Sequence, residues 1–146
     1  MDYKKFMLLA LDKARAAGST RGACVIKKGK LVSCETNHVH RLNDPSAHAE
    51  VEAIRSACKK FRSTHLDGCV VVCTTEPCPM CLMACYYSRV KKIVWGARSS
   101  DAMRWGRNEI AKNRHVIGEI SKITKIELKQ DFMRKECIAL LKECGP

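Results

Sequence analysis

The sequence is poor in aromatic residues and contains no long apolar run. Phe, Trp and Tyr make up 5% of the 146 residues, which leaves few ring surfaces on which nucleic-acid bases could stack. The longest apolar runs are residues 6–11 and 81–87, and both are far shorter than the roughly 18 residues that a membrane-spanning helix needs. The first run ends at Asp12, too early for a secretory signal. We therefore expect no membrane segment and no export signal.

Acidic residues are scarce relative to basic ones. The chain has 15 Asp and Glu against 27 Lys and Arg, which gives a formal net charge of +12. Such an excess is typical of proteins that bind a polyanion such as nucleic acid, but Lys and Arg also solvate the exposed faces of ordinary helices. The sequence has no block of about five or six like charges, which excludes a basic tail. Charge alone leaves both interpretations open.

Cysteine is abundant, with ten residues in the chain. Because no export signal is visible, we expect reduced thiols in a cytoplasmic protein rather than a disulfide framework. Eight of the ten fall within apparent strands and helices, where a thiol packs as a small apolar side chain; these are Cys24, Cys34, Cys58, Cys69, Cys73, Cys85, Cys137 and Cys144. Only Cys78 and Cys81 combine the spacing of metal ligands with the start of a helix.

Hydrophobic periodicity and turn residues predict a single domain over residues 1–146, in which helices alternate with strands. Helices are expected at 3–17, 46–61, 79–88 and 132–143, with a short one near 101–107. Strands are expected at 23–26, 31–34, 69–73, 92–96 and 123–128, the first two joined as a hairpin. This order predicts the α/β class, as a three-layer α/β/α sandwich around a mixed sheet of about five strands.

Metal-ligating side chains open two of these helices. His48 and Glu50 stand at the start of the second helix, and Cys78 and Cys81 at the start of the third. Three protein ligands, His48, Cys78 and Cys81, leave the fourth tetrahedral position of a zinc ion to water, as in catalytic sites. Because positions i and i+2 of a helix point about 200° apart, Glu50 can share this site only if the metal lies beyond the helix end. Glu50 is then a general acid and base rather than a ligand.

Other interpretations of the same residues remain open. Cys85 or Cys73 could complete a closed structural zinc site, since Cys85 lies four positions after Cys81 on the same helical face. His48 could be a buried histidine without a metal, and Glu50 a solvated helix residue. The alternative function class is therefore a noncatalytic, zinc-stabilised binding module.

The stretches 43–50 and 75–81 resemble the two motifs of the cytidine deaminase-like superfamily of zinc-dependent deaminases. They are most similar to the branch that contains bacterial guanine deaminases and tRNA adenosine deaminases, and the similarity covers residues 3–100 and, more weakly, the rest. The resemblance implies a zinc cofactor, hydrolytic release of ammonia from an amino-bearing nucleobase, and a homodimer. It implies that Glu50 moves protons from water to a ring nitrogen and to the departing amine.

The resemblance also implies substrate contacts. Asn37 lies 11 positions before His48, where the family carries an Asn that contacts the base. The backbone amides of Ala49 and Cys78 are expected to hold the base and the oxygen that develops charge. Trp105 is either a base-stacking residue or part of the core.

The choice of base is less constrained by the sequence. We expect a free guanine-like base or a small related heterocycle, although guanine deaminases carry an acidic cluster in the C-terminal third for which only Glu109 or Asp101 could substitute. The alternative is a tRNA-specific adenosine deaminase that converts adenosine to inosine, which the basic charge and the segment 123–144 favour. Arg104 and Arg107 could contact phosphates or solvent.

Overall fold

The computed structural model describes residues 1–107, 109–110 and 112–145. The helices are α1 (Tyr3–Ala16), α2 (Val39–Leu42), α3 (Ala49–Phe61), α4 (Pro79–Tyr87), α5 (Ser99–Arg104), α6 (Asn113–Thr124) and α7 (Arg134–Cys144). The strands are β1 (Gly22–Lys27), β2 (Lys30–Thr36), β3 (Cys69–Thr75), β4 (Lys92–Ala97) and β5 (Glu127–Lys129). None of the described helices is long and apolar enough to cross a bilayer.

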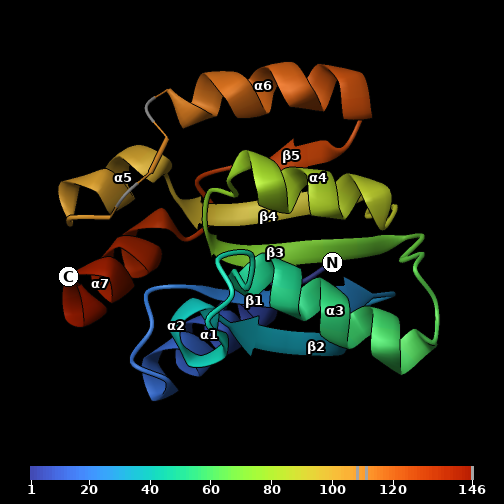
Figure 1. The fold of residues 1–146 in the computed structure, drawn as a ribbon, viewed down its shortest axis with the longest axis horizontal. Helices are drawn as coiled ribbons and strands as arrows, with labels where there is room; N and C mark the ends of the chain where they lie inside the picture. The colour runs from blue at the N-terminus through green and yellow to red at the C-terminus, as the bar shows by residue number, and fades with distance from the viewer. Residues whose placement is uncertain (108, 111, 146) are drawn as a thin grey trace.

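The five strands form one mixed sheet in the order β2-β1-β3-β4-β5 (Figure 1). β1 pairs antiparallel with both β2 and β3, whereas β3, β4 and β5 are parallel. The β1–β2 hairpin turns through Lys28 and Gly29, which both have positive φ, as a two-residue turn that matches the twist of the strands requires. The mixed five-stranded sheet expected from the order of elements is confirmed.

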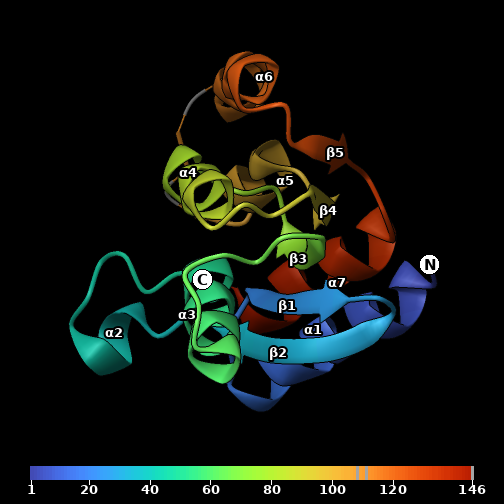
Figure 2. The ribbon, with the colours of Figure 1, turned by 90° about the vertical axis from the view of Figure 1, so that its right-hand side faces the viewer.

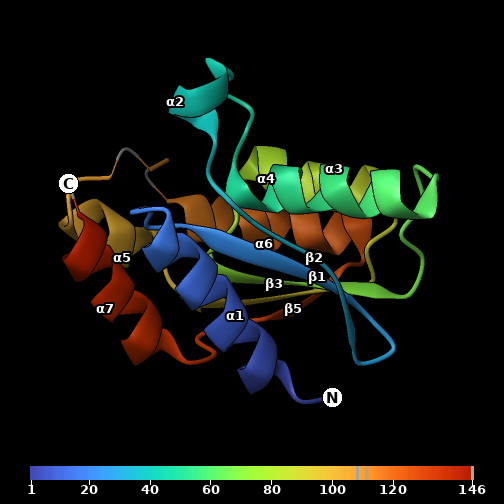
Figure 3. The same cartoon turned by 90° about the horizontal axis from the view of Figure 1, so that it is seen from below.

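Helices cover both faces of the sheet, so the three-layer prediction is also confirmed. Figures 2 and 3 show α3, α4 and α6 on one side of the strands and α1 and α7 on the other. The side chains of β3 alternate between two cores: Val71 and Cys73 pack with α3 and α4, and Val70 and Val72 pack with α1 and α7. All seven residues of β3 are buried, because a central strand has a helical layer on each face.

The C-terminal third differs from the sequence prediction. The strand expected at 123–128 is present but begins later: β5 covers Glu127–Lys129, whereas Ile123 is 82% exposed and belongs to α6. This helix was not expected from the sequence, because Ile123 and Thr124 favour strands. In the structure, Ile117 and Ile120, three residues apart, bury one helical face against the first core. A one-turn helix, α2, also lies between β2 and α3, where no helix was expected.

Candidate active site

His48 and Cys78 are the residues that immediately precede two helices. His48 is the N-cap of α3 and Cys78 the N-cap of α4, and both have extended backbone conformations. Neither side chain caps its own helix, so both are available to the site. Pro79 occupies the first turn of α4, where its missing N–H costs no hydrogen bond and its fixed φ favours a helix start.

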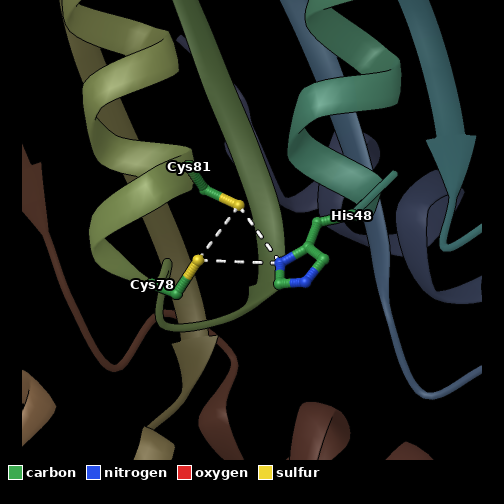
Figure 4. A group of neighbouring side chains, drawn as sticks. All are labelled: His48, Cys78 and Cys81. Carbon is green, nitrogen blue, oxygen red and sulfur yellow. Dashed lines mark hydrogen bonds between the residues drawn. The ribbon is translucent and has the colours of Figure 1, made fainter. Parts of the chain in front are cut away.

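Figure 4 shows that His48, Cys78 and Cys81 point toward one another from α3 and α4. The Nδ1 atom of His48 lies 3.6 Å from the sulfur of Cys78 and 3.5 Å from that of Cys81, and the two sulfurs are 3.4 Å apart. A tetrahedral zinc ion, with Zn–S near 2.3 Å and Zn–N near 2.0 Å, spaces such ligand atoms about 3.5–3.8 Å apart. The three atoms therefore fit the ligand set of zinc, with the fourth position free of these ligands.

One thiol of the cluster, that of Cys78, favours its negatively charged form, whereas the hydrogen bond with Cys78 raises the pKa of Cys81. The hydrogen bond with Cys81 lowers the pKa of Cys78 to about 4, although burial opposes the shift. The hydrogen bond with Cys78 raises the pKa of His48. A thiolate is thus stabilised at a helix N-terminus, where the dipole favours negative charge.

Glu50 lies beside this cluster without joining it. Its Oε2 atom is 3.5 Å from the sulfur of Cys81, and only 6% of the residue is exposed. Burial raises the pKa of the carboxyl group, because a low-dielectric surrounding disfavours its charged form. A carboxyl group with a raised pKa in a pocket can accept and return a proton near neutral pH.

A pocket of about 620 Å³ opens above the cluster, a volume typical of sites for small ligands. His48, Glu50 and Cys78 contribute to its wall on one side. The remaining lining residues come from several segments, and they are Thr20, Arg21, Asn37, Val39, His40, Pro45, Glu76, Met80, Arg107, Glu109 and Ile110. The pocket therefore joins the cluster of His48 and Cys78 to segments far from it in the sequence, among them residues 20–21 and residues 107, 109 and 110.

The interpretation as a closed zinc site is not supported by the geometry. Among the described residues, the cluster of possible metal ligands is His48, Cys78 and Cys81. Cys73 and Cys85 are buried in the first core instead, and burial raises the pKa of both thiols. They pack as apolar side chains.

The other expected contact residues have different positions. Asn37 lines the pocket, and its Oδ1 atom accepts a hydrogen bond from the amide of Val39, so its NH₂ group remains to donate to a ligand. Ala49 is the first residue of α3, where backbone amides lack partners within the helix. Trp105 does not line the pocket; it packs against the second core, with the Lys142 ammonium 5.5 Å from the ring centre.

The fold places some charged residues of the C-terminal third in the pocket wall and others outside it. Glu109 lines the pocket, where it pairs with Arg21. Asp101 lies elsewhere, because it caps α5 and accepts two hydrogen bonds from Arg134. Arg107 reaches the pocket wall and donates to the carbonyl of Cys144, and Arg104 is exposed.

Sequence reasoning missed three residues that build the site. Glu76 is 3% exposed and accepts a hydrogen bond from the amide of Ser99. Asn113 donates to the carbonyl of Pro77, which ties the start of α6 to the loop that carries Cys78. Arg21, which lines the pocket, directly precedes β1 and belongs to none of the motifs found in the sequence. Of these three residues, only Glu76 could have been found from the sequence, because it directly precedes the Pro77-Cys78 motif.

Residues 1–97 match the family model of the cytidine and deoxycytidylate deaminase zinc-binding region. The chain belongs to this family, and fold and site together define an enzyme of the deaminase class. Among curated relatives, it is 41% identical over 104 residues to the guanine deaminase of Bacillus subtilis, covering 70% of this chain and 67% of that one. It is 38% identical over 101 residues to the tRNA-specific adenosine deaminase of Aquifex aeolicus, covering 66% and 67%.

A solved structure of the guanine deaminase from Nitrosomonas europaea is similar over nearly the whole chain. The TM-score is 0.82 at 28% identity, and the match covers 97% of this chain and 81% of that one. The similarity to the deaminase superfamily proposed from the two motifs is therefore confirmed.

Proposed function

We propose that this protein, as a single domain over residues 1–146, hydrolyses the amino group of guanine or of a small related base, with zinc bound by His48, Cys78 and Cys81. The observation that carries the choice of base is Glu109. Its carboxylate lines the same pocket as Glu50 and its side chain is only 11% exposed. A buried carboxylate is a strong acceptor for a ring N–H such as that of guanine. The resemblance to guanine deaminases supports the same choice.

The roles of the surrounding residues follow from their positions. Bound zinc would supply an acidic water molecule, and thus a hydroxide nucleophile near neutral pH. Glu50, buried next to Cys81, takes one proton from the attacking water and gives it to a ring nitrogen of the base. It then carries the second proton, that of the added hydroxyl, to the amine, which leaves as ammonia. Asn37 and the amides of Ala49 and Cys78 hold the base, since all three lie at the pocket or at a helix start beside it.

The test replaces Glu50 by Gln and measures both ammonia release from guanine and bound zinc. We expect E50Q to lose at least about 100-fold in kcat, because the proton carrier is removed, while it retains its zinc. The matched control is E52Q, since Glu52 stands on the same first turn but pairs with Arg55 outside the pocket. Unchanged turnover in E50Q would contradict the mechanism and favour a noncatalytic binding module.

A second candidate substrate is adenosine in tRNA. The net charge of +12 and the similarity to a tRNA-specific adenosine deaminase favour it. Free guanine, isocytosine, cytosine, cytidine and a tRNA anticodon stem-loop should be compared as substrates of the wild type. Turnover of guanine supports the first proposal, and turnover of the stem-loop alone overturns it.

We also propose a homodimer in the cytoplasm. The outer face of α4 exposes large apolar side chains, with Met80, Tyr86 and Tyr87 exposed by 38%, 44% and 73%, which supports an interface there. All ten cysteines are free thiols, as a reducing compartment requires. Sedimentation at working concentration tests the dimer, and a monomer would contradict it.

A further inference from the structure

An ion pair between Arg21 and Glu109 forms part of the pocket wall. The two residues are 88 positions apart in the sequence, so only the fold brings them together. Their side chains are 18% and 11% exposed, and the pair is therefore largely removed from water. A guanidinium and a carboxylate thus stand next to each other where a ligand would bind.

The backbone of Arg21 is fixed on several sides. Its amide donates to the hydroxyl of Ser19, and its carbonyl accepts hydrogen bonds from Ser19 and from Thr36. Gly22, the next residue, packs so closely on α1 that a Cβ atom there would lie 2.0 Å from the carbonyl oxygen of Ala10. The guanidinium therefore extends from a rigid base, which makes it suitable for discriminating between ligands.

The pair retains unused hydrogen-bonding capacity. One N–H group of Arg21 donates to one oxygen of Glu109, whereas a guanidinium has five such groups and a carboxylate two oxygens. Within the part of the chain that the structure describes, neither side chain makes another hydrogen bond.

We propose that Arg21 is a specificity-determining residue that, with Glu109, binds the amide edge of a lactam base. The guanidinium donates to the carbonyl oxygen of the base, while Glu109 accepts the neighbouring ring N–H. This inference rests on the proposed function, and it adds the residue that selects a carbonyl over an amino group. Arg is well suited to the task because its fork of donors matches a base carbonyl.

Two purines differ at this edge while they share the amino group at C2. Guanine presents an N1–H donor next to the C6 carbonyl. In 2,6-diaminopurine the same positions carry an unprotonated nitrogen and an amino group, so the donor and the acceptor are exchanged. The Arg21–Glu109 pair therefore matches guanine and opposes 2,6-diaminopurine.

The experiment compares the wild type with Arg21→Met and Arg21→Lys, using kcat and KM for guanine and the inhibition constant of 2,6-diaminopurine. We expect R21M to lower kcat/KM for guanine by about 10- to 100-fold, mainly through KM, because one directional contact to the base is lost. Binding of 2,6-diaminopurine should be unchanged or tighter, so that the preference for guanine falls. R21K should recover part of the preference, since the positive charge returns without the planar fork.

Arg104→Met is the matched control, since Arg104 is exposed and does not line the pocket. It removes one positive charge and should keep the wild-type preference. Zinc content and melting temperature are measured for each variant, so that a general loss of structure is recognised.

Guanine turnover with an unaltered preference in R21M contradicts this inference alone. Equal loss of binding for both purines contradicts it as well. Absence of guanine turnover in the wild type contradicts the proposed function, and the inference fails with it.

Discussion

Cys81 and Cys85 lie one turn apart on α4 and are both fully buried. Only Cys81 belongs to the cluster with His48 and Cys78, whereas Cys85 packs in the first core. The two thiols lie on the same helical face but about 6 Å apart along the helix axis, so they have different surroundings, and those surroundings decide their chemistry. Cys81 contacts a thiol, an imidazole and a carboxylate. For Cys85, burial is the largest influence on the pKa of the thiol, and it raises that pKa.

Substitution of each cysteine by Ser separates a ligand from a core residue. We expect C81S to lose zinc affinity by at least about 100-fold, because a neutral hydroxyl replaces a thiolate ligand. C85S should keep one zinc per chain and lose about 1–2 kcal/mol of stability, since a hydroxyl is placed among apolar side chains. Zinc content after dialysis and urea denaturation check the two outcomes. If C81S kept one zinc per chain after dialysis, Cys81 would be excluded as a ligand.

At the scale of elements, α5 and α7 are joined by Asp101. One oxygen of its carboxylate accepts from the amide of Arg98 at the start of α5, and both oxygens accept from Arg134 at the start of α7. The Asp101 side chain is 10% exposed. This connection orients the chain just before Arg107 and Glu109 enter the pocket wall, so a structural ion pair supports the site from outside.

Asp101→Asn should lower the free energy of unfolding by about 1–3 kcal/mol near neutral pH, because a charged bidentate partner of Arg134 is lost. The hydrogen bonds from Arg134 lower the pKa of Asp101. A carboxyl group with a depressed pKa stabilises the fold above its unfolded pKa, near 3.9, and this contribution disappears as the pH falls through the folded value. The difference between wild type and D101N should therefore be full at pH 6–7 and shrink below about pH 4.

Asp131→Asn provides the comparison at the same end of the molecule. Asp131 and Arg98 form an ion pair in which each side chain is 33% exposed, and such surface pairs contribute little to stability because water and salt screen them. We therefore expect a smaller effect from D131N than from D101N. Urea denaturation of all three proteins from pH 3 to pH 7 measures both effects. A D101N deficit that persists unchanged at pH 3 would show that packing, rather than charge, is responsible.

At the scale of the whole molecule, the proposed zinc ligands lie on two helices of one layer. α3 follows β2 and α4 follows β3, and the two helices cover the same face of the sheet. His48 belongs to one and the two cysteines to the other (Figure 4). A bound ion therefore adds a direct link between elements that otherwise meet through apolar packing, and its binding energy is part of the stability of the folded state.

Removal of zinc with a chelator should lower the melting temperature by about 10 °C. Zinc at about 1,000 times its dissociation constant stabilises a fold by about 4 kcal/mol, and each kcal/mol corresponds to about 2–4 °C in a domain of this size. Differential scanning calorimetry of the zinc-loaded and chelated protein measures the shift, and C81S should show none. Identical melting curves for the two wild-type samples would contradict a zinc site between α3 and α4.

The sequence by itself determined the elements that carry the chemistry. Alternation of apolar residues, the Gly29 turn and Pro79 were sufficient to predict the first hairpin and the helices that begin after His48 and Cys78. These signals are local, because a turn or a helix start depends on residues a few positions apart. Cys78 and Cys81 were identifiable for the same reason, since they lie three positions apart, and so was the pair of His48 and Glu50, two positions apart.

The tertiary structure decided which of the remaining charged residues belong to the pocket. Glu109 and Asp101 were equivalent in the sequence, but one pairs with Arg21 in the pocket and the other with Arg134 outside it. No local pattern distinguishes them, because each depends on a partner far away in the chain. The same holds for Asn113, which reaches Pro77 across 36 positions. The reaction class thus followed from local motifs, whereas the wall that selects the base is formed by long-range contacts.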